Sequence, residues 1–212
     1  MLFRSIDRIG LALVCAASLL AGVSARAADE AADALIKRLS TDVLESIKAD
    51  KSMQTGDGSK VVALVDAKVM PNVNFARMTA AAVGPAWRQA TAEQQKRLQD
   101  EFKILLVRTY SGALSQVSDQ SISLKPTRGA PEDREVVVRT EIRGHGDPIQ
   151  LDYRLEKTPG EGAGWKIYNL NVMGVWLVET YRGQFAQEIN AKGIEGLITT
   201  LTARNKANAK KG

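Results

Sequence analysis

Cysteine and histidine, which often act as nucleophiles, bases or metal ligands, are scarce in this chain of 212 residues. There is one cysteine, Cys15, inside an N-terminal apolar run, and one histidine, His145. His145 stands between Gly144 and Gly146, a context typical of an exposed turn. A metal site normally needs several such ligands, and no Ser-His-Asp set can be assembled around this histidine. The sequence therefore predicts no metal site and no catalytic residue.

A neighbouring acid and phenol, Asp152 and Tyr153, support a hypothesis of enzymatic function. A buried aspartate and a tyrosine can move a proton next to a carbonyl group of a small hydrophobic substrate. However, residues 149–156 alternate between apolar and polar types, so adjacent side chains are expected on opposite faces of a strand. This alternation weakens the enzyme hypothesis. Arg182 and Lys166 are candidates for contacting a phosphate, with surface ion pairs as the alternative.

The first 27 residues have the pattern of a cleaved signal peptide. Arg4 and Arg8 precede an uncharged apolar run over 9–22, and Ala25 and Ala27 supply the small residues before the cleavage site. Cleavage after Ala27 removes three arginines and one aspartate, so the formal net charge falls from +5 to +3. Because aromatic residues are few and are not interleaved with basic clusters, we expect no binding of nucleic acid. Residues 206–212 are expected to form a basic, disordered tail.

The first part of the exported chain is expected to be helical. Apolar residues at helical spacing predict a helix over 29–50. A second, shorter helix is expected to begin at Ser59 as its N-cap and to end before Pro71. A third is expected over 75–83, before a break at Gly84.

A long amphipathic helix is predicted next. Thr91 can cap its start, and Gln94 can reach back to the Thr91 backbone, which is the pattern of a capping box. One continuous apolar stripe runs from Leu98 to Val117, opposite a charged side.

The hydrophobic period then changes to two. Strands are predicted over 121–127, 134–143, 149–156 and 165–173, and Gly174 is expected to end the sheet. Short connections between these strands favour an antiparallel meander with one covered face.

Helical periodicity returns over 177–189 and 194–201, on either side of Gly193. Helices before and after a block of strands predict an α+β fold, in which helices cover a curved antiparallel sheet.

Three apolar stripes are candidates for a solid core or for the wall of a cavity, and periodicity does not separate the two. They comprise Phe102, Leu106 and Tyr110; Val136, Val138, Leu151 and Tyr153; and Val172, Val175, Trp176, Val178, Tyr181 and Phe185. A solid core favours a protein-docking adaptor, whereas a cavity favours a carrier of an apolar ligand.

An ordered set of short motifs closely resembles the MlaC family, also called toluene-tolerance proteins. The motifs are Val83-Gly84, Trp87, Ala90-Thr91, Gln94, Phe102, Leu105-Leu106, Thr109-Tyr110, Trp165-Lys166-Ile167-Tyr168, Gly174-Val175, Leu177-Val178, Tyr181-Arg182, Gly193-Ile194 and Gly196-Leu197. The resemblance extends from about Asp29 to Asn205. Members of this family are periplasmic phospholipid-binding components of the Mla lipid-transport system of Gram-negative bacteria.

The resemblance implies a single domain over 28–205, in which an NTF2-like sheet and an additional N-terminal helical part enclose a phospholipid pocket. The three stripes would form its wall, with Arg182 and Lys166 near the headgroup, and no catalysis, metal or cofactor is implied. A monomer in the periplasm would carry lipid between two complexes and so maintain outer-membrane asymmetry. The implied partners are an inner-membrane ABC transporter with a lipid-binding ring protein and an outer-membrane lipoprotein–porin complex.

Three positions depart from the family pattern. Asn74 and Asn169 stand where the family commonly has an acidic residue, and Trp176 stands where it commonly has serine. The two asparagines put in doubt any salt bridge or docking contact made at these positions in other members. Trp176 is expected to narrow or to line the mouth of the pocket.

Overall fold

The computed structural model describes residues 30–54, 58–114, 119–126, 133–144 and 146–209. The expected signal peptide and His145 lie outside the described residues, as do 210–212. No helix among those that the model describes is long and apolar enough to cross a membrane.

The sheet has five antiparallel strands in the order of the sequence. The strands are β1 (Ser121–Leu124), β2 (Glu135–Arg143), β3 (Ile149–Lys157), β4 (Trp165–Val172) and β5 (Val175–Trp176). The predicted meander is confirmed, but the expectation that Gly174 ends the sheet is wrong. Met173 and Gly174 both have positive φ, at 51° and 88°, and they form a two-residue turn after which β5 pairs back onto β4.

The helices are α1 (Ala32–Ala49), α2 (Lys51–Gln54), α3 (Gly58–Leu64), α4 (Phe75–Val83), α5 (Ala92–Leu114) and α6 (Leu177–Ala209). A π-helical turn, η1 (Val65–Val69), and two 3₁₀ turns, η2 (Met70–Asn72) and η3 (Gly84–Gln89), connect some of them. The predicted α+β class is confirmed.

Two local expectations at α3 are corrected. Ser59 lies inside α3, which begins at Gly58, so it is not the N-cap residue. Pro71 does not end the helix, because the chain has already loosened into the π turn. Pro71 instead lies at the start of η2, where its missing N–H removes no helical hydrogen bond.

The predicted interruption of the last helix is confirmed. Gly193 has a φ of 69°, and the two halves of α6 meet there at a kink. The second half continues to Ala209, so residues 206–209, which were expected in the disordered tail, are helical. Near this end, the Asn205 side chain donates to the Glu101 carbonyl at 2.9 Å and to the Glu101 carboxylate at 2.6 Å, which ties α6 to α5.

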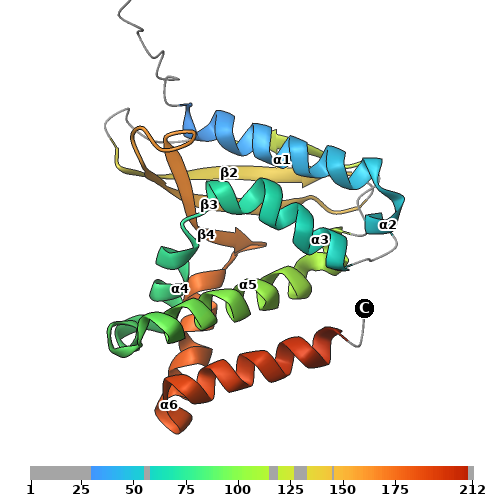
Figure 1. The fold of residues 1–212 in the computed structure, drawn as a ribbon. Coiled ribbons are helices and arrows are strands. Elements are labelled where there is room, and N and C mark those ends of the chain that lie inside the picture. The colour runs from blue at the N-terminus through green and yellow to red at the C-terminus, as the bar shows by residue number, and fades with distance from the viewer. Residues whose placement is uncertain (1–29, 55–57, 115–118, 127–132, 145, 210–212) are drawn as a thin grey trace, which may run out of the picture.

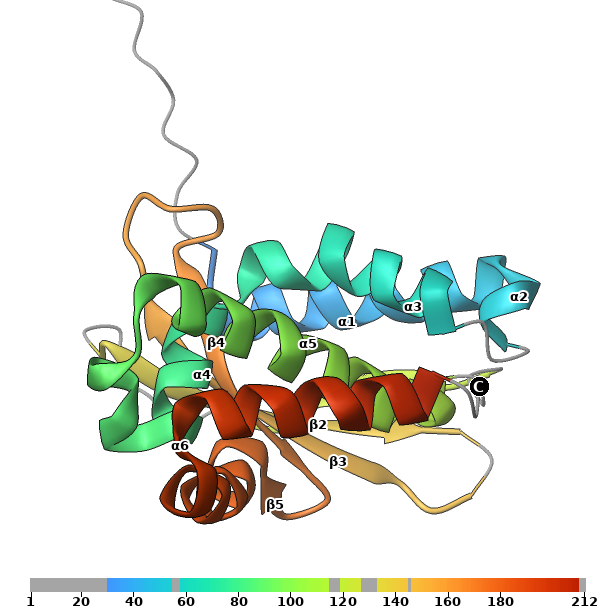
Figure 2. The same cartoon turned by 60° about the horizontal axis from the view of Figure 1, so that its bottom comes forward.

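The layers are visible in Figure 1, where α1 lies across the sheet, with α3, α5 and α6 following in turn away from it. Figure 2 shows α5 and the second half of α6 running side by side. The packing agrees with this order, because α5 contacts α6, α4 and α3, while α1 contacts β1 and β2. The face of the sheet toward α1 is called the inner face below.

Two main hydrophobic clusters form the interior. One joins α4, α5 and α6, and the other joins α1 to Val138, Leu155, Trp165 and Ile167 of the sheet. Val73, which forms an isolated bridge with Ile167, packs against both clusters. The structure therefore has a helical core and a sheet core with a boundary between them.

Candidate functional site

The inner face of the sheet carries two neighbouring rows of residues, which the strand register defines. One row is Val138, Tyr153 and Leu170, and the next is Thr140, Leu151, Val172 and Val175. Val138 is fully buried, Tyr153 and Leu170 are half-buried, and Val175 is 50% exposed. The inner face therefore becomes more accessible from β2 toward β5.

Tyr153 occupies the middle of the inner face, between Val138 and Leu170. Burial raises the pKa of the Tyr153 phenol, whereas hydrogen bonds with Ser40 and Thr140 act in the opposite direction. Although protein surrounds the side chain, part of its surface remains accessible to solvent. Tyr153 is therefore a candidate for contact with a ligand on the inner face.

The two halves of α5 differ in how deeply their apolar side chains are buried. Leu98, Phe102 and Leu105 are fully buried against α4 and α6. Leu106 and Tyr110, further along, are only half-buried at the edge of this cluster. Burial raises the pKa of the Tyr110 phenol, and the nearby Tyr181 raises it further. The second half of α5 thus presents apolar surface that remains partly accessible.

Five half-buried residues lie at the edges of the two cores, and a sixth, Leu151, pairs with Thr140 and Val172 on the inner face. We call them the half-buried set: Leu106, Tyr110, Leu151, Tyr153, Leu170 and Val172. Five of them were predicted as wall residues from sequence, and they lie on α5, β3 and β4. Such a group offers apolar contact to a flexible hydrocarbon chain and very few polar atoms.

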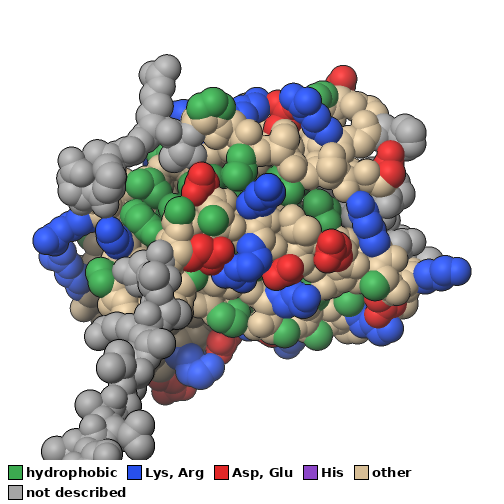
Figure 3. All heavy atoms as spheres, turned by 90° about the horizontal axis from the view of Figure 1, so that it is seen from above, with side chains coloured by type: hydrophobic (Ala, Val, Ile, Leu, Met, Phe, Trp, Pro, Cys, Tyr) green, Lys and Arg blue, Asp and Glu red, His purple; other side chains and the backbone are tan. Residues whose placement is uncertain are grey.

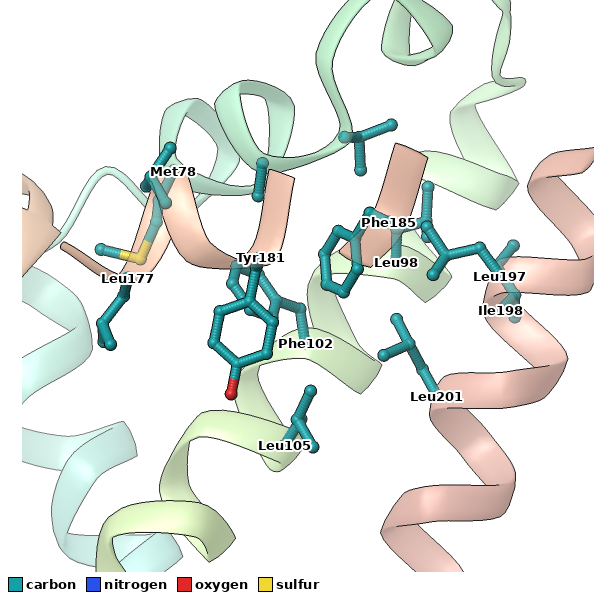
Figure 4. Packing of buried hydrophobic residues seen from close by; sticks show 13 residues of the cluster. Met78, Leu98, Phe102, Leu105, Leu177, Tyr181, Phe185, Leu197, Ile198 and Leu201 are labelled. Carbon is teal, nitrogen blue, oxygen red and sulfur yellow. The ribbon is translucent and has the colours of Figure 1, made fainter. Parts of the chain in front are cut away.

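Other predicted wall residues belong to solid core. The Phe102 ring centroid lies 5.0 Å from that of Tyr181 and 5.1 Å from that of Phe185, with both pairs edge to face (Figure 4). Val138 and Val178 are also buried, and Val136 packs against the sheet core. These six side chains contribute to the packing of the two cores.

Trp176 is on the other face of the sheet. It pairs with Asn171 on the outer face, and the Arg154 guanidinium lies 3.9 Å from its ring centroid. The same guanidinium forms an ion pair with Glu179 at 2.5 Å. The structure therefore does not bring Trp176 to the half-buried set.

The two candidate phosphate ligands already have protein partners. Arg182 donates from Nε to the Ala81 carbonyl at 2.9 Å, which joins α6 to α4. The Lys166 ammonium lies 3.5 Å from the Glu161 carboxylate. Lys166 is near the start of β4, whereas Val172 is the last residue of this strand. Neither side chain is gathered with the half-buried set.

The two asparagines that depart from the family pattern have structural roles. Asn74 caps α4 by accepting from the Arg77 N–H at 3.0 Å, and it donates to Glu156 at 2.6 Å. Asn169 is buried, accepts from the Val178 N–H at 3.2 Å and donates to Glu179 at 2.8 Å. The donation by each amide requires an N–H that a carboxylate lacks.

The acid–phenol pair of the enzyme hypothesis is not assembled. Asp152 and Tyr153 lie on opposite faces of β3, as their alternation predicted. Asp152 accepts from Gln150 at 2.8 Å on the outer face, away from the half-buried set. Among the described residues no group of acidic, histidine or cysteine side chains is arranged to hold a metal ion.

Leu170 is the member of the half-buried set that sequence reasoning missed. A β-bulge between Arg154 and Leu155 shifts the register of β3 against β4. Ile167 and Leu170 therefore share the inner face, although they are three residues apart. The sequence contains a signal for this bulge. Apolar residues alternate at Trp165 and Ile167 and then, three residues later, at Leu170 and Val172.

Comparisons with known proteins find similar sequences. A family model described as MlaC protein matches residues 37–203. Toluene tolerance protein ttg2D of Pseudomonas putida is 27% identical over 191 residues, which cover 89% of this chain and 85% of the relative. The intermembrane phospholipid transport system binding protein MlaC of Haemophilus influenzae is 24% identical over 169 residues, covering 79% and 78%.

A solved structure is also similar over most of the chain. It is the phospholipid-binding protein from Ralstonia solanacearum in complex with a phospholipid, which is 46% identical to this chain. The match has a TM-score of 0.80 and covers 84% of this chain and 98% of the solved one.

Proposed function

Because the chain belongs to the MlaC family, we propose that it binds a glycerophospholipid, with the acyl chains lying between the inner face of the sheet and the second half of α5. The observation that carries this proposal is the half-buried set, whose six apolar or aromatic side chains stay partly accessible on α5 and on the inner face of the sheet. The phospholipid bound by the similar Ralstonia solanacearum structure supports the choice of ligand.

The energetics of a carrier fit a hydrocarbon-lined interior. Each methylene removed from water contributes about 0.8 kcal/mol, so two acyl chains of membrane length represent on the order of 20–25 kcal/mol as an upper bound. A carrier must offset nearly all of this free energy, or the lipid stays in the membrane. It must not exceed it by much, or the lipid is never released. Contacts with accessible, half-buried side chains suit such a balance better than a tightly closed core.

We further propose that the protein carries its lipid through the periplasm without catalysing a reaction, and so maintains outer-membrane asymmetry. The name of the Haemophilus influenzae relative supports a role in transport between membranes. The docking partners would be the inner-membrane ABC transporter with its lipid-binding ring protein and the outer-membrane lipoprotein–porin complex. Positive, negative and hydrophobic side chains are interspersed on the face in Figure 3, which suits transient docking.

Solvent extraction of the purified protein followed by mass spectrometry tests the binding proposal. We expect close to one glycerophospholipid per wild-type chain. Leu106→Gln places an amide among the apolar members of the half-buried set, so the variant should retain several-fold less lipid because burying an unpaired polar group is costly.

Ile104→Gln is the matched control. Ile104 is also half-buried on α5, but it packs against none of the hydrophobic clusters of the described residues. This variant should therefore retain wild-type lipid. A wild-type extract without phospholipid, or equal lipid in the two variants, would contradict the proposed site and favour a protein-docking adaptor.

A further inference from the structure

The exposed large hydrophobic residues of the described chain gather at one end of the sheet. They are Ile149, Met173 and Val175, with exposed fractions of 36%, 68% and 50%. Met173 donates from its backbone N–H to the Gln150 carbonyl at 2.9 Å, and Val175 is two residues further along. We call Ile149 and the hairpin turn Val172–Val175 the apolar tip.

The backbone conformation of Met173, in the apolar tip, is unusual for a methionine. Met173 is the one non-glycine residue with positive φ among those that the structure describes. In a two-residue hairpin turn this position favours asparagine, aspartate or glycine, which adopt the left-handed conformation at lower cost. A methionine that is both strained and exposed stabilises neither the turn nor the core, so it calls for another explanation.

The apolar tip continues the surface of the proposed lipid site. Val172 belongs to the half-buried set and pairs with Val175. Leu151, also in the set, is two residues from Ile149 on the same face of β3. Apolar side chains therefore follow one another on the inner face, from half-buried Leu151 and Val172 to the exposed end of the sheet.

The charge around the tip favours an uncharged, apolar environment. Residues 167–178 contain no charged side chain. The charges that flank this segment are largely matched, because Arg154 pairs with Glu179 and Arg143 pairs with Glu141, while Asp147 precedes Ile149 by two residues. Trp176 stands directly behind the turn, and tryptophan is enriched where protein meets the headgroup layer of a bilayer.

The size of the tip favours a bilayer over a protein as its partner. It exposes three large hydrophobic side chains, whereas a specific protein interface buries on the order of 1,000 Å² or more. A small apolar projection can enter a bilayer interface weakly and reversibly, with a strength that follows its buried apolar area.

We propose that the apolar tip inserts into the interfacial layer of a phospholipid bilayer while acyl chains pass between the bilayer and the half-buried set. This inference rests on the proposed lipid-binding function. The tip would shield the acyl chains from water as they move between the bilayer and the half-buried set.

The test measures transfer of a fluorescent phospholipid from loaded protein to vesicles of phosphatidylethanolamine and phosphatidylglycerol. Met173→Asn removes the apolar tip residue and suits the left-handed backbone, so the variant should be at least as stable as wild type. The rate of lipid transfer should fall by about fivefold or more. This is the factor expected when part of the apolar area that Met173 buries in the bilayer is lost. Ile149→Thr, which keeps a β-branched strand residue, should slow it in the same direction.

Ala203→Asn is the control, because it adds the same polar group at an exposed site of α6 and should transfer lipid at the wild-type rate. Wild-type transfer by Met173→Asn, with bound lipid unchanged, would overturn the role of the tip while leaving the proposed function intact. If instead the wild-type protein holds no phospholipid, the proposed function fails. Flotation of lipid-free protein with the same vesicles then still tests the tip, since Met173→Asn should float less.

Discussion

Arg77 joins two acidic side chains on the outer face of the sheet. Its guanidinium pairs with Glu156 and, at 2.6 Å, with Glu135, and it lies 3.6 Å from the Tyr168 ring centroid. The Tyr168 hydroxyl donates to Glu135 at 2.9 Å. Hydrogen bonds from Arg77 and then from Tyr168 lower the pKa of Glu135, while partial burial opposes them.

This lowered pKa predicts a loss of stability in acid. Glu135 contributes fully above its unfolded pKa, near 4.3, and its contribution is lost as the pH falls through the lower folded value. Glu135→Gln should therefore lower the urea midpoint at pH 7 and lower it less at pH 3. Urea titrations at both pH values check this. An equal deficit of the variant at both would contradict the ionic role of Glu135.

Phe102 is a sensitive test of the helical core. Because it is fully buried between Phe75, Tyr181 and Phe185, Phe102→Ala should lower the free energy of unfolding by about 3–5 kcal/mol. Chemical denaturation measures this change. A loss below about 1 kcal/mol would mean that the side chain lies against a space, as the sequence analysis proposed, and not in close packing.

At the scale of elements, the start of α5 was predictable in detail. Gln94 accepts from the Thr91 N–H at 3.0 Å, and the Gln94 N–H donates to the Thr91 hydroxyl at 3.2 Å, which are the two bonds of the predicted capping box. Both residues are local in sequence, so the pattern alone determines the contact.

Thr91→Ala should accordingly lower the free energy of unfolding by about 1 kcal/mol. Thr199→Ala provides a control, because the Thr199 hydroxyl bonds only to the carbonyl of Glu195 within an exposed stretch of α6. Its effect should stay within about 0.5 kcal/mol, as for most surface substitutions. Denaturation of both variants decides the matter, and similar losses would show that Thr91 contributes nothing as a cap.

The elements that the sequence did not predict depend on contacts outside the local pattern. Strand β5 has only two residues, Val175 and Trp176, too short for a period-two signal. The π turn Val65–Val69 keeps the apolar spacing of an ordinary helix, so its loosening is not visible in the sequence. The bulge in β3–β4 left a phase change, but identifying it required knowing which strands pair.

At the scale of the whole molecule, the sequence could not distinguish core from wall. Phe102 and Leu106 lie one turn apart on the same apolar stripe, yet the first is fully buried and the second half-buried. Phe102 lies at the centre of the cluster that α5 forms with α4 and α6, whereas Leu106 lies at the edge of the same cluster. A one-dimensional hydrophobic pattern records which side of a helix is covered, not what covers it.

The account depends on hydrocarbon lying at the boundary between the two cores, between the inner face of the sheet and the second half of α5. The most direct measurement is a high-resolution crystal structure of the full-length exported protein, purified without added detergent or lipid. We expect continuous electron density for acyl chains in contact with Tyr153, Leu106 and Val172. Side chains of the half-buried set that interdigitate across the boundary, with no density for a ligand, would contradict the central claim.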